Sequence, residues 1–586
     1  MPQNRSRRRA RTLTGATAVA LAAAALVALP QSGAEAAPAG RTETPLVTHS
    51  PDDDVAVSQV TLAAPLPKGF GAHPAACDTL SYLRYRSVRG PAAPTAADRV
   101  LVAQPGALAG AASLDGIARH TVENAAAQGR SVEFWALDRR ANCLDDTTGL
   151  TAAVAANDPQ VALDYYYRGA VVNGRRFAGF VPQKQLGWLS KMGVQQSVLD
   201  WHTLLLHELP DPAFRASKVW CGGHSLGGLV TGFFAASDFD GNPATTADAG
   251  YNQCAGFFAL DSQVATSIDG TLPAPAAVPA LVRAGRRAVD GAYASGVLPR
   301  SLDIPVVNAE TLNSLAITAV FAQLRPQEVS PVATFFKGNR NVTTAMRFLI
   351  SKDAGAFLTG LPSAYDFRFT NEAALGALMD DNSQPIAALQ ASVGFATGGR
   401  LAAKSFPTGN DLLRIPQLTG LTQPVLGTAR KVIPDDPGPL WARGTGPVYR
   451  WLNYDQVTSA HGKPWTTPAS EVTDIGDLAR DMAEYPLDFT EHYFPTAMFT
   501  DTLLWAAGDR GVVPTAVHLD EIGSRPTFTI LGADGLVVPF LKGRTPKDTL
   551  VLPGYQHLDV LTAAKVQNDG RREPGAAALT KYVLAH

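Results

Sequence analysis

One stretch decides the fold of this chain: Val219-Trp220-Cys221-Gly222-Gly223-His224-Ser225-Leu226-Gly227-Gly228. Apolar residues of a predicted strand run directly into Gly223-His224-Ser225-Leu226-Gly227, and a helix is predicted over 226–236. A Gly-x-Ser-x-Gly pattern between a strand and a helix is typical of a nucleophile elbow, where glycines leave room for a strained turn that exposes the serine hydroxyl. Chance alone could supply the pattern in a chain with 52 glycines. Its position between strand and helix is what makes Ser225 the predicted nucleophile.

Apolar strands and helices alternate on both sides of this turn, which predicts a parallel sheet flanked by helices. Strands are expected over 55–64, 80–88, 99–104, 131–137, 218–222, 255–260, 526–531 and 548–552, and helices over 113–128, 194–209 and 226–236. Between 262 and 523 the rhythm breaks into helix-like segments and Pro-rich connections. We interpret 262–523 as a mainly helical cap inserted into a core made of 55–261 and 524–586.

The N-terminus has the layout of a cleavable export signal. A basic stretch from Arg5 to Arg11 precedes an apolar run over 13–29, and small residues follow around Ala34-Glu35-Ala36. A permanent anchor is less favoured, because the run is rich in alanine and short for a membrane span. The sequence predicts a signal peptide over 1–36, a leader over 37–54 and a secreted protein, exported by the Sec or the twin-arginine route.

Composition excludes some partners. A formal net charge of −2 with 17% charged residues provides no basic field for nucleic acid. After the signal, no apolar segment is long enough to cross a bilayer, so we expect no stable membrane insertion. The sequence does not indicate an oligomeric state.

A nucleophilic serine needs a base, and the base needs an orienting carboxylate. Near the C-terminus, Asp534 follows one predicted strand and His557 follows the next. Both would lie at the sheet edge that holds Ser225, which makes Asp534 and His557 the preferred partners. Asp261, at the end of the strand after the elbow, is the alternative acid.

Other titratable residues are less favoured. Asp509 and His518 imitate the later pair, but no strand separates them and they precede the last two strands. His224, beside the nucleophile, is expected to be structural.

Cleavage of an ester or amide develops a negative oxygen that backbone N–H groups can stabilise. The N–H of Leu226 is one expected donor. The second should come from the loop after the strand over 99–104, where Ala107 is the predicted donor and Leu108 the alternative.

The strand order, the elbow at Ser225 and the acid and histidine after it resemble those of the α/β-hydrolase superfamily. The pattern is similar to that of bacterial secreted serine esterases and lipases. The resemblance covers about 55–261 and 524–586 and implies an α/β-hydrolase fold with the triad in the order Ser225, Asp534, His557. Members usually have His-Gly after the third strand, where this chain has Pro105-Gly106. For Asp138 and Arg139, which follow the fourth strand, the resemblance implies a structural role.

The four cysteines form an even set in a chain predicted to be exported, which favours disulfides over metal binding. The resemblance places the start of the second strand beside the end of the fourth, which implies a bridge from Cys77 to Cys143. A bridge from Cys221 to Cys254 is less favoured, because the two are out of register in the predicted neighbouring parallel strands. The loop Asp238-Phe239-Asp240-Gly241-Asn242 has its glycine at the wrong place for a calcium loop. We expect no metal and no cofactor.

These features favour hydrolysis of a small-molecule or lipid-like carboxylic ester through an acyl-enzyme. Cleavage of an amide or peptide bond by the same triad is an alternative, because the chemistry is shared. A non-catalytic binding protein is a third hypothesis, which the presence of all three predicted triad residues disfavours.

Overall fold

The computed structural model describes residues 40–52, 54–267, 278–409, 426–541, 543 and 545–586. Gly40–His586 forms one compact unit. The predicted signal peptide lies outside the described residues. Among those described, no helix has the length and apolar character needed to cross a membrane.

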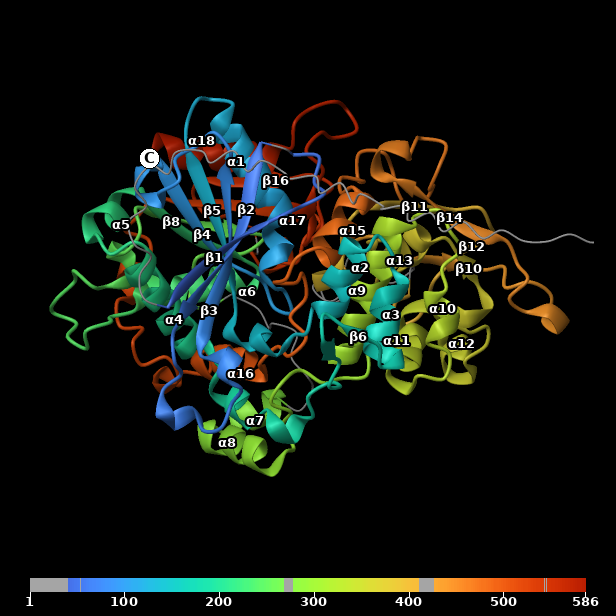
Figure 1. The fold of residues 1–586 in the computed structure, drawn as a ribbon, viewed down its shortest axis with the longest axis horizontal. Helices are drawn as coiled ribbons and strands as arrows, with labels where there is room; N and C mark the ends of the chain where they lie inside the picture. The colour runs from blue at the N-terminus through green and yellow to red at the C-terminus, as the bar shows by residue number, and fades with distance from the viewer. Residues whose placement is uncertain (1–39, 53, 268–277, 410–425, 542, 544) are drawn as a thin grey trace, which may run out of the picture. The chain divides into compact units, whose positions relative to one another are not determined.

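A nine-stranded sheet, covered by helices, is the largest sheet of the described residues (Figure 1). Neighbours pair in the order β1, β2, β3, β5, β4, β8, β9, β15, β16. Pairing is antiparallel from β1 through β3 to β5 and parallel from β5 to β16. The strands are β1 (Arg41–Leu46), β2 (Val55–Ala63), β3 (Thr79–Ser87), β4 (Arg99–Gln104), β5 (Val132–Asp138), β8 (Val219–His224), β9 (Gly256–Leu260), β15 (Thr527–Gly532) and β16 (Thr549–Leu552).

Helices cover both faces of this sheet. On one face α1 (Asp115–Ala126) packs against α18 (Pro574–Ala585) and α17 (Asp559–Thr562). On the other face α6 (Leu226–Ala236) packs against α4 (Val194–Glu208), and α5 (Pro212–Lys218) leads into β8. β4, β5, β8 and β9 consist almost entirely of buried residues, as expected of strands covered on both faces.

The predicted strands are confirmed, with ends displaced by two residues or fewer. β1 was not predicted, because it is a partly exposed edge strand without a clear apolar alternation. It pairs with β2 from Arg41↔Leu62 to Leu46↔Val57.

The long segment between β9 and β15 contains more helix than strand, and its short strands form small sheets. Its helices are α7 (Val278–Arg283), α8 (Arg286–Ser295), α9 (Ala309–Leu324), α10 (Val332–Phe335), α11 (Arg340–Ile350), α12 (Ala354–Thr359), α13 (Asn371–Met379), α15 (Ile475–Ala483) and α16 (Thr496–Ala506). Its strands are β10 (Arg368–Phe369), β11 (Gly394–Thr397), β12 (Leu401–Ala403), β13 (Val432–Pro434) and β14 (Val448–Asn453). Such short strands between turns give little periodic signal in the sequence.

A second segment joins this helical region from a distant part of the sequence. After β5 the chain forms α2 (Thr148–Ala155), α3 (Gln160–Arg168) and the small hairpin of β6 (Val171–Val172) and β7 (Arg175–Arg176). Both α2 and α3 contact α9, and Figure 1 shows them among the inserted helices. In the other direction, α16 returns to the sheet and contacts α4.

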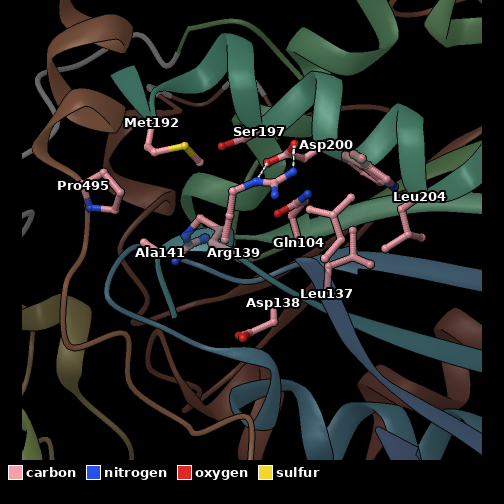
Figure 2. A pocket seen from close by; sticks show the side chains of 13 residues that line it. Gln104, Leu137, Asp138, Arg139, Ala141, Met192, Ser197, Asp200, Leu204 and Pro495 are labelled. Carbon is pink, nitrogen blue, oxygen red and sulfur yellow. Dashed lines mark hydrogen bonds and ion pairs between the residues drawn. The ribbon is translucent and has the colours of Figure 1, made fainter. Parts of the chain in front are cut away.

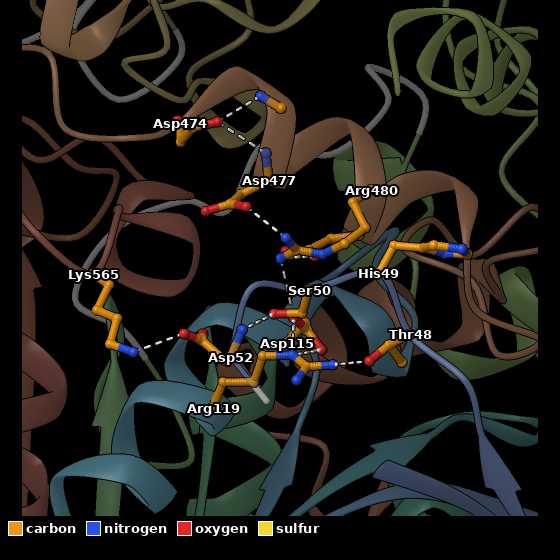
Figure 3. A network of polar contacts seen from close by, with 12 residues as sticks. Thr48, His49, Ser50, Asp52, Asp115, Arg119, Asp474, Asp477, Arg480 and Lys565 are labelled. Atoms are coloured by element: carbon orange, nitrogen blue, oxygen red, sulfur yellow. Dashed lines mark hydrogen bonds and ion pairs between the residues drawn. The ribbon is translucent and has the colours of Figure 1, made fainter. Parts of the chain in front are cut away.

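A buried ionic network joins the inserted helix α15 to the core helix α1 (Figure 3). Arg119 pairs with Asp115 at 2.9 Å within α1. Arg480 on α15 lies 3.6 Å from the same carboxylate and 2.5 Å from Asp477. The hydroxyl of Tyr485 donates to Asp115 and accepts from Arg119. These bonds fix the position of the insertion on the core.

Candidate active site

Ser225 occupies a sharp turn between β8 and α6. Its backbone angles are φ 53° and ψ −120°, a conformation that a side-chain-bearing residue rarely adopts. A Cβ on Gly223 would lie 2.6 Å from the backbone of Gly227, and one on Gly227 would lie 2.3 Å from the carbonyl of Gln104. Both glycines are therefore required by close backbone packing. Ser225 itself is partly exposed between buried neighbours, as the elbow prediction requires.

His557 pairs with Asp261. The distance from His557 Nδ1 to Asp261 Oδ2 is 2.5 Å, and the two side chains are 2% and 0% exposed. The Asp261 carboxylate also accepts hydrogen bonds from the backbone N–H groups of Gly532, at 3.1 Å, and Leu536, at 2.9 Å. A carboxylate held this way can fix the ring orientation of His557 and leave Nε2 available.

The backbone ties Ser225 to both neighbours of Asp261. The N–H of Ser225 donates to the carbonyl of Leu260 at 3.0 Å, and the hydroxyl of Ser262 donates to the carbonyl of Ser225 at 2.5 Å. His224 Nε2 lies 3.0 Å from the carbonyl oxygen of His557. The structure therefore gathers Ser225, Asp261 and His557 at one edge of the sheet.

In the described residues it is Asp261, the alternative acid, that pairs with His557, and the preferred Asp534 has a different partner. Asp534 Oδ1 accepts a hydrogen bond from the hydroxyl of Thr428 at 2.9 Å. The reason lies in the turn after β15. It wraps around the end of β9, so that the N–H groups of Gly532 and Leu536 point at Asp261 while the Asp534 side chain faces the insertion.

The two less favoured candidates lie elsewhere. Asp509 caps the short turn Arg510–Val512 by accepting from the N–H of Gly511. His518 packs against Tyr251, with ring centroids 5.7 Å apart.

The loop after β4 lies against the elbow. A Cβ on Gly106 would be 3.1 Å from Ser225 Cβ and 2.7 Å from His224 Nδ1, so this close approach requires glycine. Leu108 has a φ of 62°. Among the described residues the N–H groups of Ala107, Leu108 and Leu226 have no hydrogen-bond acceptor. All three thus remain candidate donors to a ligand oxygen.

Sequence comparisons give no family: neither the scan against family models nor the search of curated proteins finds a match. Solved structures are similar over most of the chain. Peroxisomal alpha-beta-hydrolase Lpx1 from Saccharomyces cerevisiae has 13% identity, covers 91% of each chain and has a TM-score of 0.31. A mutant epoxide hydrolase from Solanum tuberosum has 10% identity, covers 89% of this chain and 94% of its own, and has a TM-score of 0.25. Juvenile hormone epoxide hydrolase from the silkworm Bombyx mori has 10% identity, covers 87% and 73%, and has a TM-score of 0.21.

The fold is identified by the direction of the strands and by the position of the elbow. An antiparallel β3 beside β5, a parallel run from β5 to β16 and an elbow directly after β8 occur together. The chain has the α/β-hydrolase fold.

Arg139 shapes the loop after β4 in this fold. Its guanidinium donates to the carbonyls of Pro105, at 2.9 Å, Gly106, at 2.5 Å, and Ala109, at 2.8 Å, and it pairs with Glu491 at 2.5 Å. Arg139 thus binds the carbonyl groups of this loop, while the N–H groups of Ala107 and Leu108 have no acceptor in the described residues. These contacts agree with the structural role expected of Arg139.

The neighbours of Arg139 have separate partners. Arg140 pairs with Asp200 at 2.6 Å, and Figure 2 shows Asp138 lying apart from Asp200. Asp138 accepts from the N–H of Ala111 at 3.2 Å and from the amide of Asn142 at 2.5 Å. Burial raises the pKa of Asp138 to about 7. Asp138 therefore also acts on local structure.

His224 is buried beside His557, with ring centroids 4.4 Å apart. Burial lowers the pKa of His224 well below its usual value, and the neighbouring His557 lowers it further. A neutral His224 that donates from Nε2 holds the carbonyl of His557 in place. This contact is structural, which is the role that the sequence predicts for His224.

Both cysteine pairs are joined. Cys77 bonds Cys143, with Cα atoms 5.1 Å apart, as the antiparallel pairing of β3 with β5 implied. Cys221 bonds Cys254, with Cα atoms 6.0 Å apart. In the pairing of β8 with β9, Cys221 lies opposite Phe257. Cys254 precedes β9, so it is not bound by this register and reaches Cys221 from the preceding segment. Two disulfides are consistent with an extracellular protein.

Proposed function

We propose that this protein is a secreted serine hydrolase that cleaves carboxylic esters through an acyl-enzyme intermediate. The observation that supports the proposal most directly is the Asp261–His557 pair beside the strained turn at Ser225. A buried carboxylate on Nδ1 fixes the tautomer that leaves Nε2 as a base for a serine hydroxyl. Asp261 takes the role of the orienting acid.

In the proposed reaction, the hydroxyl oxygen of Ser225 attacks the ester carbonyl while His557 Nε2 takes its proton. His557 then gives the proton to the leaving alcohol, and the acyl group stays on Ser225. A water molecule, deprotonated by His557, releases the acid and restores the serine. Asp261 stabilises the imidazolium in both halves of the cycle.

The negative oxygen would be held by the N–H groups of Leu226 and Ala107. Support comes from the N–H groups of Leu226 and Ala107, which have no acceptor in the described residues, and from Arg139, which holds nearby carbonyl groups. Removing one such donor typically costs about 10²- to 10³-fold in kcat. The substrate class we propose is a small or lipid-like ester.

The test is hydrolysis of p-nitrophenyl esters of rising acyl length beside aminoacyl p-nitroanilides. We expect ester turnover, and a loss of about 10³-fold or more in Ser225→Ala. Ser217→Ala, which alters an exposed serine on α5, is the matched control and should keep full activity. Turnover of anilides alone would favour a peptidase, and ester turnover unchanged in Ser225→Ala would contradict the proposal.

A further inference from the structure

Three side chains far apart in the sequence meet in the interior: Asp145, Asp488 and His492. Each is 3% exposed or less. One ligand atom from each lies within 4.8 Å of the other two. Asp145 follows β5, and the other two residues lie between α15 and α16.

Asp145 Oδ2 accepts a hydrogen bond from the N–H of His492 at 3.2 Å, but most other polar atoms of these side chains lack a partner. Asp145 Oδ1, both carboxylate oxygens of Asp488 and His492 Nε2 are buried with no hydrogen-bond partner in the described part of the chain. Buried polar atoms without partners are costly, and a cluster of them indicates an unseen ion or water. Four such atoms converge here.

The imidazole of His492 lies between the two carboxylates. His492 Nδ1 lies 3.8 Å from Asp145 Oδ1, and His492 Nε2 lies 3.5 Å from Asp488 Oδ2. A single ion would bind only one of these two nitrogens, at about 2.1 Å. The site therefore rests on the spacing of one ligand atom from each residue, all within 4.8 Å of one another.

The surroundings of the three residues are acidic. Glu491 is buried close by, and Asp138 is a further carboxylate in the same group. In the described residues the one guanidinium paired with this group is Arg139, which is bound to Glu491. A divalent cation would offset the remaining negative charge.

From these contacts we infer that Asp145, Asp488 and His492 bind a Zn²⁺ ion. One imidazole with two carboxylates is a donor set that suits zinc, whereas Ca²⁺ takes six to eight oxygen ligands. The sequence indicated no metal, because the chain has no clustered cysteines and histidines with metal-ligand spacing. Asp488 follows Asp145 only after 343 positions, so no local pattern joins them.

The ion would brace the loop after β4. The carbonyl of Asp488 accepts from the N–H of Ala112, and the N–H of Glu491 donates to the carbonyl of Leu108 at 2.9 Å. Glu491 in turn holds Arg139. Fixing Asp488 and His492 to Asp145 thus fixes the segment on which this loop rests.

The experiment measures metal content and melting temperature of the purified protein after chelator treatment, with Zn²⁺ or Ca²⁺ added back. We expect one Zn²⁺ per chain and a rise in Tm of about 2 °C or more at saturating Zn²⁺. Asp488→Asn keeps the shape and removes a buried charge, so the variant should fold and lose the response to Zn²⁺. His492→Gln should lose it too.

Asp240→Asn is the control, because Asp240 is an exposed carboxylate outside the cluster of Asp145, Asp488 and His492, so this change should leave the response intact. The inference is overturned if the wild-type protein neither keeps nor responds to Zn²⁺, or if Asp488→Asn responds as the wild type does. A response to Ca²⁺ alone would overturn the zinc assignment.

Discussion

Two turns at the same edge of the sheet each present an acid, and they use it differently. Asp261, directly after β9, is fully buried, has a φ of 37° and binds His557. Asp534, just after β15, is partly exposed and accepts a hydrogen bond from Thr428 of the insertion. The turn with Asp534 supplies backbone N–H groups to Asp261. Of two acids that look equivalent in the sequence, one thus contacts the histidine, and the other belongs to the turn that supports this contact.

The largest expected effect separates the two acids directly. Asp261→Asn should lower kcat about 10³- to 10⁴-fold, because the amide favours the wrong tautomer of His557. Asp534→Asn, the matched control, should stay within about 3-fold of the wild type, since its side chain lies outside the proposed proton path. Steady-state ester hydrolysis measures both. The reverse ranking would restore Asp534 as the orienting acid.

A smaller effect should follow from adding a side-chain atom to the turn with Asp534, where it would press against Asp261. A Cβ on Gly535 would lie 2.6 Å from Asp261 Oδ2. Gly535→Ala should displace the carboxylate and lower kcat roughly 10- to 100-fold with little change in KM. Gly523→Ala, at an exposed glycine with no atom within 4 Å of an added Cβ, is the control. Equal activity in the two variants would show that the turn does not position Asp261.

The pH dependence of stability tests the surroundings of His557, the partner of Asp261. His224 packs against His557 and has a pKa well below its usual value in the fold. Below about pH 6.5 the unfolded chain binds a proton at this site that the folded chain does not, so stability falls as the pH falls, by up to about 1.4 kcal/mol per pH unit. His224→Gln should reduce this slope in urea unfolding between pH 6.5 and 4.

Burial also depresses three other histidines: it lowers the pKa of His120, His202 and His492 to about 4, so part of the slope should remain in His224→Gln. His461→Gln, at an exposed histidine, serves as the control and should keep the wild-type slope. An unchanged slope in His224→Gln would contradict a neutral, buried His224.

The smallest effect is expected at the contact of Asp534 with the insertion. Thr428→Val removes the hydroxyl that donates to Asp534 and keeps the shape of the side chain. We expect kcat within about 2-fold of the wild type and a loss of stability of about 1 kcal/mol or less. A large drop in kcat would show that Asp534 acts in the reaction through this bond.

Much of the fold follows from local sequence patterns. The buried strands and the elbow have strong signals, because apolar runs, glycines and a helix must coincide there. By contrast, β1 and the strands of the insertion are short or exposed, and α2 and α3 reach the insertion only through tertiary contacts. No local pattern specifies those contacts.

The candidate site was predictable in part for a similar reason. Ser225 and His557 follow from the order of strands and turns. The choice between Asp261 and Asp534 depends on how one turn wraps around another, which involves the N–H groups of Gly532 and Leu536 and no side chain. The contacts of Arg139 with the loop after β4 are likewise long-range.

The proposal that Ser225 is the nucleophile is tested most directly by locating a covalent adduct. The purified protein is treated with a fluorophosphonate, digested, and sequenced by tandem mass spectrometry. We predict one adduct per chain, on the peptide that contains Gly223-His224-Ser225-Leu226-Gly227 and at Ser225 itself. An adduct on another residue, or no adduct on active protein, would contradict the account.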